Sequence, residues 1–246
     1  MAIVPADKAQ EGEDGMALAW PLIAENATGE DVRSVQYLVT AHGHPTAVDG
    51  VFGPLTKAAV EAFQASRGLA VDGIVGPQTW PQLIVQVLQG SQGDPVRAVQ
   101  SQIHSRGDGA VIAVDGMFGP DTADAVAAFQ QLLGLTVDRI VGPVTWSSLL
   151  DGYLTAIDPA TAAQRTFDAW VAHSQPAARK DATPAAVAQL FAQSFSQADG
   201  WSSEGCQGAA GHTFCSWRRS NGTELRIGVE NAVIGPFYAV DEIQFT

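Results

Sequence analysis

A long stretch of this chain occurs twice, first from Gly29 to Leu83 and again from Gly93 to Leu149. Both copies read G-x-x-V-R-x-V-Q, then V-D-G-x-F-G-P-x-T-x-x-A-V-x-A-F-Q, then G-L-x-V-D-x-I-V-G-P-x-T-W-x-x-L. The two copies differ in length by two residues between Gln36 and Asp49, in a loop where insertions cost little. A tandem repeat of this length predicts two domains of the same fold.

Each copy contains three apolar stretches with helical spacing. In the first copy, Val32, Val35 and Leu38 recur on one side of a helix. The second stretch opens at Gly53-Pro54, a pair typical of a helix start, and its apolar stripe includes Phe63. The pattern predicts a small three-helix bundle in each copy, near the lower size limit for a self-sufficient core.

The third helix of each copy is predicted to be short. It opens at Gly76-Pro77 in the first copy and at Gly142-Pro143 in the second, and it presents Trp80 or Trp146. By alignment, Phe129 is the equivalent of Phe63, so we expect one buried phenylalanine per bundle.

Aspartate–glycine pairs mark turns between these helices. They occur at Asp49-Gly50, Asp72-Gly73 and Asp115-Gly116, because glycine accepts positive φ and aspartate bonds the local backbone. The fourth site is Asp138-Arg139, which lacks the glycine. That turn is predicted to adopt another conformation or to carry strain.

These spaced residues closely resemble the peptidoglycan-binding domain 1 family. The matching residues of the first copy are Gln36, Asp49-Gly50, Phe52-Gly53, Thr56, Ala59-Val60, Phe63-Gln64, Gly68-Leu69, Asp72-Gly73, Gly76 and Thr79-Trp80. Those of the second are Gln100, Asp115-Gly116, Phe118-Gly119, Thr122, Ala125-Val126, Phe129-Gln130, Gly134-Leu135, Asp138, Gly142 and Thr145-Trp146. The second copy departs from the family pattern at Arg139.

The resemblance covers about half of the chain and implies a non-catalytic module that holds a protein on the bacterial cell wall. Such modules often accompany amidases, peptidases or lytic enzymes. Most motif residues are interpreted as structural: glycines form turns, aromatic residues form the core, and Thr56 and Thr122 make local hydrogen bonds. The pattern therefore identifies the module and leaves its ligand-binding residues unknown.

The composition narrows the choice of partner. The chain has 26 acidic and 13 basic residues, for a formal charge of −13, and no basic patch. Nucleic acid and anionic membrane surfaces are therefore not expected partners, and no apolar run is long enough to cross a bilayer. The expected partner is peptidoglycan, and no cofactor is expected.

The expected location is secreted or associated with the cell wall. Residues 1–28 form an acidic N-terminal segment without the basic and apolar regions of a signal peptide. We expect either that a signal has been removed from the chain or that export is non-classical, and we favour removal. In a secreted protein, the pair Cys206 and Cys215 is most simply a disulfide.

The remaining region is predicted to be a small α+β accessory domain with an open role, including a possible protein partner. Two helices are predicted, one over 162–172 with Phe167, Trp170 and Val171 on one side, and one capped by Thr183. A loop is predicted over 200–211, followed by three strands over 212–219, 223–229 and 236–245. The sequence thus divides into 1–28, repeat one (29–84), repeat two (93–150) and the accessory domain (158–246), giving a mainly α chain that ends in an α+β domain.

This last region contains residue types that could serve catalysis. Cys206 with His212 would suit a thiol hydrolase, but a cysteine in a Gly/Ser-rich loop beside a second cysteine favours the disulfide. His42-x-His44 has no carboxylate at metal-ligand spacing, so no metal site is predicted. Asp241-Glu242 is more typical of a solvated pair than of a glycosidase dyad. No catalytic residue is assigned.

Exposed tryptophans can stack on sugars, and two tryptophans of this region are candidates. Trp217 shares a strand face with Cys215 and is predicted to pack over the disulfide, in the core. Trp201 lies in a polar loop, and both core packing and exposure stay open for it.

Three functions are compatible with this sequence. The first is a secreted, non-enzymatic wall-binding protein with a C-terminal accessory domain. The second is a wall hydrolase with an unrecognised site in residues 158–246. The third is a structural or interaction protein, either a wall-contacting component of a phage or secretion particle or an inhibitor whose third domain engages a protein partner.

Overall fold

A computed structural model describes residues 18, 20–106, 112–152, 158–196, 198, 200–209, 211–230 and 238–246. They form two compact units, which are described separately. One unit is built mainly from the two repeats, and the other contains the C-terminal region together with Arg106 and residues 127–137. Within the described residues, no helix is long and apolar enough to span a membrane.

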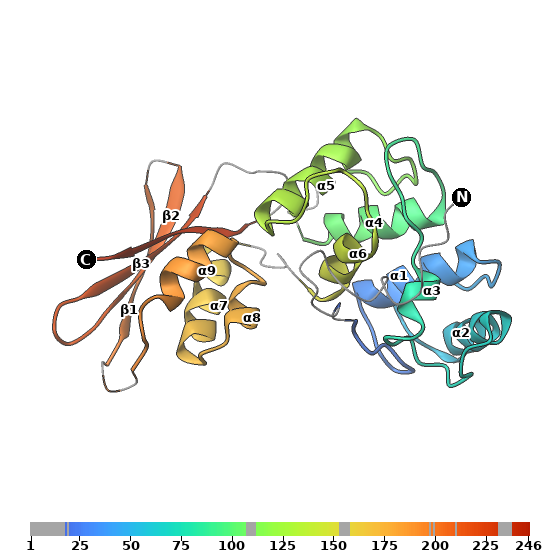
Figure 1. Cartoon of the computed structure of the whole chain (residues 1–246), viewed down its shortest axis with the longest axis horizontal. Helices are drawn as coiled ribbons and strands as arrows, with labels where there is room; N and C mark the ends of the chain where they lie inside the picture. Colours follow the sequence, from blue (N-terminus) through green and yellow to red (C-terminus); the bar gives the residue numbers. More distant parts are fainter. Residues whose placement is uncertain are drawn as a thin grey trace. The chain divides into compact units, whose positions relative to one another are not determined.

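The repeats are helical, with three helices in each. Repeat one contains α1 (Glu30–Ala41), α2 (Pro54–Arg67) and α3 (Trp80–Leu83), and repeat two contains α4 (Asp94–His104), α5 (Pro120–Leu132) and α6 (Pro143–Leu150) (Figure 1). This confirms the predicted pair of three-helix units. The prolines open α2, α5 and α6 because their missing N–H group has no helical partner at that position.

One helix start was misplaced in the prediction. In repeat one, Gly76-Pro77 leads into a turn, and α3 begins only at Trp80. The aligned pair in repeat two does open a helix, since α6 begins at Pro143. At the other end of α2, Gly68 adopts φ 68° and closes the helix in the left-handed conformation, as expected.

The core of each repeat is formed by the residues that the spacing selects. Phe63 and Phe129 are both buried, as predicted for equivalent positions. The indole N–H groups of Trp80 and Trp146 donate to the carbonyl oxygens of Pro21 and Val85, at 2.8 and 2.9 Å. Each buried tryptophan therefore anchors the segment that precedes its own repeat.

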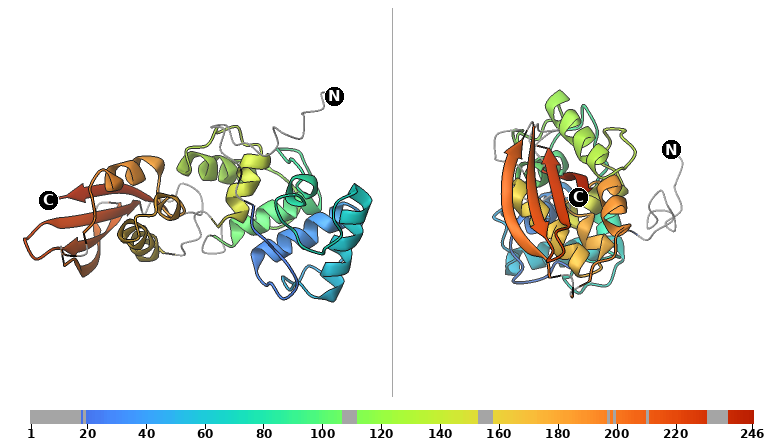
Figure 2. Two further views of the ribbon diagram at one scale, coloured as in Figure 1. Left: turned by 60° about the horizontal axis from the view of Figure 1, so that its bottom comes forward. Right: turned by 90° about the vertical axis from the view of Figure 1, so that its left-hand side faces the viewer.

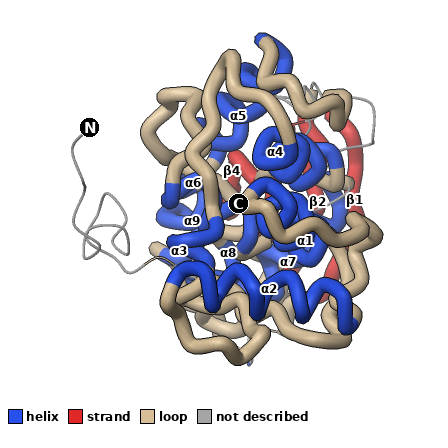
Figure 3. Tube along the Cα trace, turned by 90° about the vertical axis from the view of Figure 1, so that its right-hand side faces the viewer, coloured by secondary structure: helices blue, strands red, loops and turns tan. Residues whose placement is uncertain are grey.

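The two repeats pack against each other through their first helices, α1 and α4, which lie side by side in Figure 3. Ser34 of α1 and Ala98 of α4, which are equivalent residues, are both fully buried. The Gln102 side chain reaches from α4 to α1 and donates to the Asp31 carboxylate at 2.8 Å and to the Ser34 hydroxyl at 2.9 Å. The repeats thus share a buried interface.

The C-terminal unit is α+β. Its helices are α7 (Pro159–Val171), α8 (Gln175–Ala178) and α9 (Pro184–Phe191), and its strands are β1 (Ser202–Ala209), β2 (His212–Arg218), β3 (Glu224–Glu230) and β4 (Val240–Phe245). The strands form an antiparallel sheet in the order β1-β2-β3-β4. Helices α7 and α9 pack on one face of this sheet (Figure 2). Thr183 caps α9 as predicted, accepting a hydrogen bond from the Ala186 N–H.

The structure corrects the count of elements predicted for this unit. The described residues contain three helices and four strands, where two helices and three strands were expected. The predicted loop over 200–211 contains β1, whose Gly/Ser-rich sequence has little strand propensity of its own. Its order comes from pairing with β2, in a register that sets Cys206 opposite Cys215. Residues 236 and 237 of the last predicted strand lie outside the described residues.

Aromatic packing fills the space between helices and sheet. Phe167 of α7 stacks on Trp217 of β2, with ring centroids 4.5 Å apart and planes inclined by 4°. Trp217 is buried in the same core as Cys215, where its ring stacks on Phe167. Val171 was expected on the buried side of α7 but is exposed, because it is the last residue of that helix.

Candidate functional site: the turn faces of the two repeats

A buried glutamine holds the first turn of repeat one. The Gln36 side-chain nitrogen donates to the Asp49 carboxylate at 2.8 Å, to the Val51 carbonyl at 3.1 Å and to the Thr56 hydroxyl at 3.1 Å. Its side-chain oxygen accepts the Gly50 N–H at 2.9 Å. The two N–H donors of the amide are shared among the carboxylate, the carbonyl and the hydroxyl, and its oxygen accepts the backbone N–H, so one side chain fixes the turn.

The same arrangement recurs along the chain, and we call it the glutamine lock. In the second turn of repeat one, Gln64 bonds Asp72, Gly73, Ile74 and Thr79. In the first turn of repeat two, Gln100 bonds Asp115, Gly116, Met117 and Thr122. Repeat one is thus assembled from two similar helix–turn units. Sequence reasoning missed this, although V-D-G-V-F-G-P-x-T and V-D-G-I-V-G-P-x-T in repeat one carried the signal.

The carboxylates of three locks are held in their charged form. The Val51 N–H, followed by the Gln36 amide, lowers the pKa of Asp49. Likewise the Ile74 N–H and then Gln64 lower the pKa of Asp72. The Met117 N–H and then Gln100 lower the pKa of Asp115. These aspartates are committed to the turns, and their charges are compensated locally.

The fourth turn keeps the same backbone although arginine replaces glycine. Arg139 adopts φ 61°, and the Ile140 N–H still donates to the Asp138 carboxylate at 2.8 Å. The Thr145 hydroxyl donates to the Ile140 carbonyl at 3.3 Å, as Thr79 does to Ile74. The sequence predicted either another conformation or strain at this turn, and the structure shows the strained alternative. A left-handed conformation costs a residue with a side chain roughly 1–2 kcal/mol.

A short extended segment before each repeat connects its two turns. In repeat one we call residues 20–28 the lead segment: Ile23 pairs with Val75, and Thr28 pairs with Val51. In repeat two the lead segment is residues 84–92, where Val87 pairs with Val141 and Gln92 with Met117. Residues 20–28 were assigned to the N-terminal acidic segment from the sequence, but they pack on repeat one.

Each lead segment and the two turns beside it form what we call the turn face of that repeat. Inward residues such as Ile23 and Val75 are buried. Outward positions carry exposed apolar side chains: Leu22, Val51 and Ile74 in repeat one, and Leu88 and Met117 in repeat two. Single exposed apolar residues are common on protein surfaces. One such pair occupies equivalent positions of the two repeats: Val51 is 49% exposed, and its equivalent, Met117, is 56% exposed.

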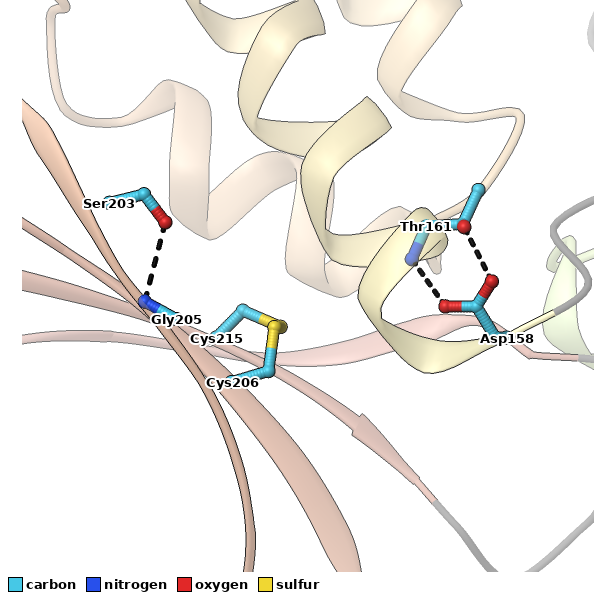
Figure 4. Close-up of a disulfide and its surroundings, with 6 residues drawn as sticks. All are labelled: Asp158, Thr161, Ser203, Gly205, Cys206 and Cys215. Atoms are coloured by element: carbon cyan, nitrogen blue, oxygen red, sulfur yellow. Dashed lines mark hydrogen bonds between the residues drawn. A yellow bond between two sulfur atoms is a disulfide. The ribbon is translucent and has the colours of Figure 1, made fainter.

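The cysteine and histidine that would suit a thiol hydrolase are not paired in the accessory domain. Cys206 and Cys215 are joined in a disulfide between β1 and β2, beside the Ser203–Gly205 contact (Figure 4). A bonded Cys206 carries no thiolate for the proposed pairing with His212. Instead, the His212 ring lies 3.1 Å from the Asp241 carboxylate.

The histidines of repeat one have structural contacts. His42 contacts the Leu83 carbonyl at 2.9 Å and the Arg67 guanidinium at 2.9 Å, and it packs on Phe63. Burial is the main cause that lowers the pKa of His42. Among the described residues, no group of three or more His, Cys, Asp or Glu side chains is placed to hold a metal ion.

Trp201, which the sequence left open, packs against the accessory core. Its ring lies 5.8 Å from Trp170, and the Arg219 guanidinium covers it at 4.9 Å. The ring is therefore engaged within the domain, by the guanidinium over one face and by the T-shaped contact with Trp170, which disfavours a role in sugar stacking.

Each of the two helical repeats matches the model of a known protein family. Residues 28–83 and 92–149 each match the family described as "Putative peptidoglycan binding domain". The chain therefore carries two tandem domains that belong to this peptidoglycan-binding family.

Similar proteins include wall enzymes. The chain is 36% identical over 99 residues to the zinc D-Ala-D-Ala carboxypeptidase of Streptomyces albus G, covering 40% of this chain and 38% of that protein. It is 42% identical over 80 residues to an uncharacterized protein of Kitasatospora aureofaciens (bpoA1 3' region), covering 31% and 67%. It is 38% identical over 103 residues to the N-acetylmuramoyl-L-alanine amidase CwlM of Mycobacterium tuberculosis, covering 37% and 25%. The chain thus spans from a quarter to two thirds of the length of these relatives.

Solved structures with similar sequence include a peptidoglycan-binding protein from Clostridioides difficile in complex with glutamine hydroxamate. It is 35% identical, with a TM-score of 0.26, and the match covers 28% of this chain and 42% of that one. The Burkholderia AP3 phage endolysin is 36% identical, with a TM-score of 0.25, covering 35% and 33%.

Proposed function

We propose that this protein is a secreted, non-catalytic peptidoglycan-binding protein whose turn faces contact the wall polymer. The observation that carries the proposal is the recurrence of exposed apolar side chains at Val51 and Met117, in two domains of a peptidoglycan-binding family. About half of each residue is open to solvent. The domain bounds that go with this proposal are 29–84, 93–150 and 158–246, the last acting as an accessory domain with a possible protein partner.

The binding chemistry follows from the character of these faces. The carboxylates on them are held by turn N–H groups and glutamine amides, so they are poorly placed to bind further cations. Apolar side chains and exposed backbone suit the uncharged parts of the polymer, its sugar rings and the methyl groups of its peptides. Rising salt should therefore weaken this uncharged part of the contact little.

A sedimentation assay with purified sacculi tests this proposal. The double variant Val51→Asp/Met117→Asp should be retained about tenfold less than the wild type, a loss of ~1.4 kcal/mol. Each single variant should lose less, since the other repeat still binds. Val171→Asp, an equally drastic change at an exposed valine of the other unit, is the matched control. Wild-type retention of the folded double variant would exclude the turn faces as the binding surface.

A wall hydrolase is the second candidate. It is supported by the names of the carboxypeptidase and amidase relatives and by the His212–Asp241 pair. With Cys206 in a disulfide, this pair has no thiol beside it in the arrangement first considered. Release of soluble muropeptides from sacculi by the pure protein would favour the hydrolase, and the loss of that release in His212→Ala would place its site.

A further inference from the structure

Arg139 is an outlier among four equivalent turns. The other three use Gly50, Gly73 and Gly116, which reach positive φ without a steric cost, whereas Arg139 holds φ 61° with a full side chain. Strained residues persist where the surrounding structure fixes them, and they concentrate at functional sites.

The ion pair between the Arg139 guanidinium and Asp124 does not offset the strain at this turn. The two groups lie 3.4 Å apart, and their side chains are 54% and 74% exposed. An ion pair this open is screened by water and salt and contributes little to stability. Repeat one manages without the pair, since it has Gly73 and Ala58 at the two aligned positions.

The neighbouring sequence accommodates the larger residue. A Cβ atom placed on Gly73 would lie 2.9 Å from the Cγ atom of Lys57 in α2. The residue aligned with Lys57 in repeat two is Ala123, whose short side chain removes that obstacle. Repeat two therefore has both an arginine in the turn and the space to hold it.

Arg139 is also the most exposed arginine of repeat two. Arg106 is buried, and Arg97 is 40% exposed and paired with Asp94 at 2.8 Å. In a chain of formal charge −13, a guanidinium on the turn face is the feature that suits an anionic group.

We propose that Arg139 makes the turn face of repeat two specific for an anionic group of the wall polymer, a carboxylate or a phosphate. This rests on the proposed function and deepens it: repeat one contacts uncharged parts of the polymer, and repeat two adds a charge-assisted contact. The two repeats are thus unequal, although their folds are the same.

The test combines stability and binding in one variant. Arg139→Gly restores the glycine of the other turns, so its thermal unfolding midpoint should rise while its retention on sacculi at low salt falls about tenfold. Retention of Arg139→Gly should also be less sensitive to added salt than that of the wild type. Asp124→Asn removes the intramolecular ion pair and keeps the arginine, so its retention should match or exceed the wild type.

Two preparations of sacculi identify the anion. If the effect of Arg139→Gly persists on sacculi stripped of phosphate-containing polymers, the anion is a carboxylate of the peptides. If the effect disappears there, the anion is a phosphate. Unchanged retention of Arg139→Gly, or a lower unfolding midpoint, would overturn the inference, whereas a wild type that is not retained at all would overturn the proposed function itself.

Discussion

Gln102 in repeat two and Asp31 in repeat one are joined by a 2.8 Å hydrogen bond across the interface of the repeats. The same side-chain nitrogen also donates to Ser34 at 2.9 Å. Gln102 and Ser34 are buried, so removing one repeat would expose polar and apolar groups of the other. Deletion of a repeat therefore changes stability as well as binding, and point variants on each turn face are the cleaner way to measure how much each repeat contributes.

Gln102→Ala should destabilise the repeat unit by about 1–3 kcal/mol, because it leaves the buried Ser34 hydroxyl without its donor. The measurement is the free energy of unfolding from denaturant titration. Gln82→Ala, at an exposed position in α3, is the matched control and should change it little. Equal stability of the two variants would mean that the interface bond contributes nothing measurable.

The glutamine lock gives a second prediction. Gln64→Leu keeps the size of the side chain but leaves the buried Gly73 N–H without its acceptor and the Thr79 hydroxyl without its donor. We expect a loss of about 1–3 kcal/mol in the free energy of unfolding. The exposed Gln78→Leu in the neighbouring turn serves as control. A stable Gln64→Leu would show that water can replace the amide.

Acid should weaken the repeats through Asp49, Asp72 and Asp115. Their pKa values in the folded protein lie below the ordinary value, which is about 3.9 in an unfolded chain. The unfolded state therefore binds protons more readily at low pH. The stability from these groups is complete above about pH 5 and is lost as pH falls through their folded pKa values.

The triple variant with asparagine at these three positions isolates this effect. Asparagine retains an oxygen that accepts the turn N–H groups, but it does not titrate. The unfolding midpoint of the triple variant should therefore fall less between about pH 5 and pH 2.5 than that of the wild type. The lowered pKa of His42 affects stability at higher pH, beginning as pH falls below the ordinary value of 6.5. This effect is the same in both proteins. An equal fall of the unfolding midpoint in the two proteins over this pH range would contradict the prediction.

The disulfide should matter only to the accessory domain. Cys206 and Cys215 are nine residues apart in the sequence. In the chain-entropy model, closing a loop of this length stabilises the folded state by roughly 2–3 kcal/mol. Cys206→Ser/Cys215→Ser should lower the unfolding transition of that domain and leave the transition of the repeats in place. Mass spectrometry after alkylation without reductant checks the bond itself: two alkylated thiols in the native protein would reopen the thiol-hydrolase interpretation.

The sequence predicted those features whose cause is local. Pro54 and Pro120 open helices and Asp–Gly pairs form turns because the preference lies in the residues themselves. The role of Gln36 was not predicted, because its partners lie 13 to 20 residues away and only folding brings them together. Strand β1 was missed for a similar reason, since Gly205 and Gly208 favour no strand and the order comes from pairing with β2.

For the candidate site, the family pattern located the module but not its outer face. Motif residues such as Phe63 are conspicuous because they build the core, whereas Val51 and Met117 occupy a variable position of the same motif. Their shared exposure is seen only when the two repeats are compared. Arg139 was recognised from the sequence as a departure, and the structure adds that the turn keeps its shape around it.

The glutamine locks also have a consequence for the order of events in folding. Gln36, Gln64 and Gln100 reach their aspartates over 13, 8 and 15 residues, so each lock closes a short loop. Loops near ten residues close within about 10–100 ns, and local contacts favour fast folding. The lead segment instead pairs Ile23 with Val75, far along the chain. We therefore expect the helix–turn units to form first and the lead segments to dock last, so that the face proposed to contact the wall is the final part of each repeat to be completed.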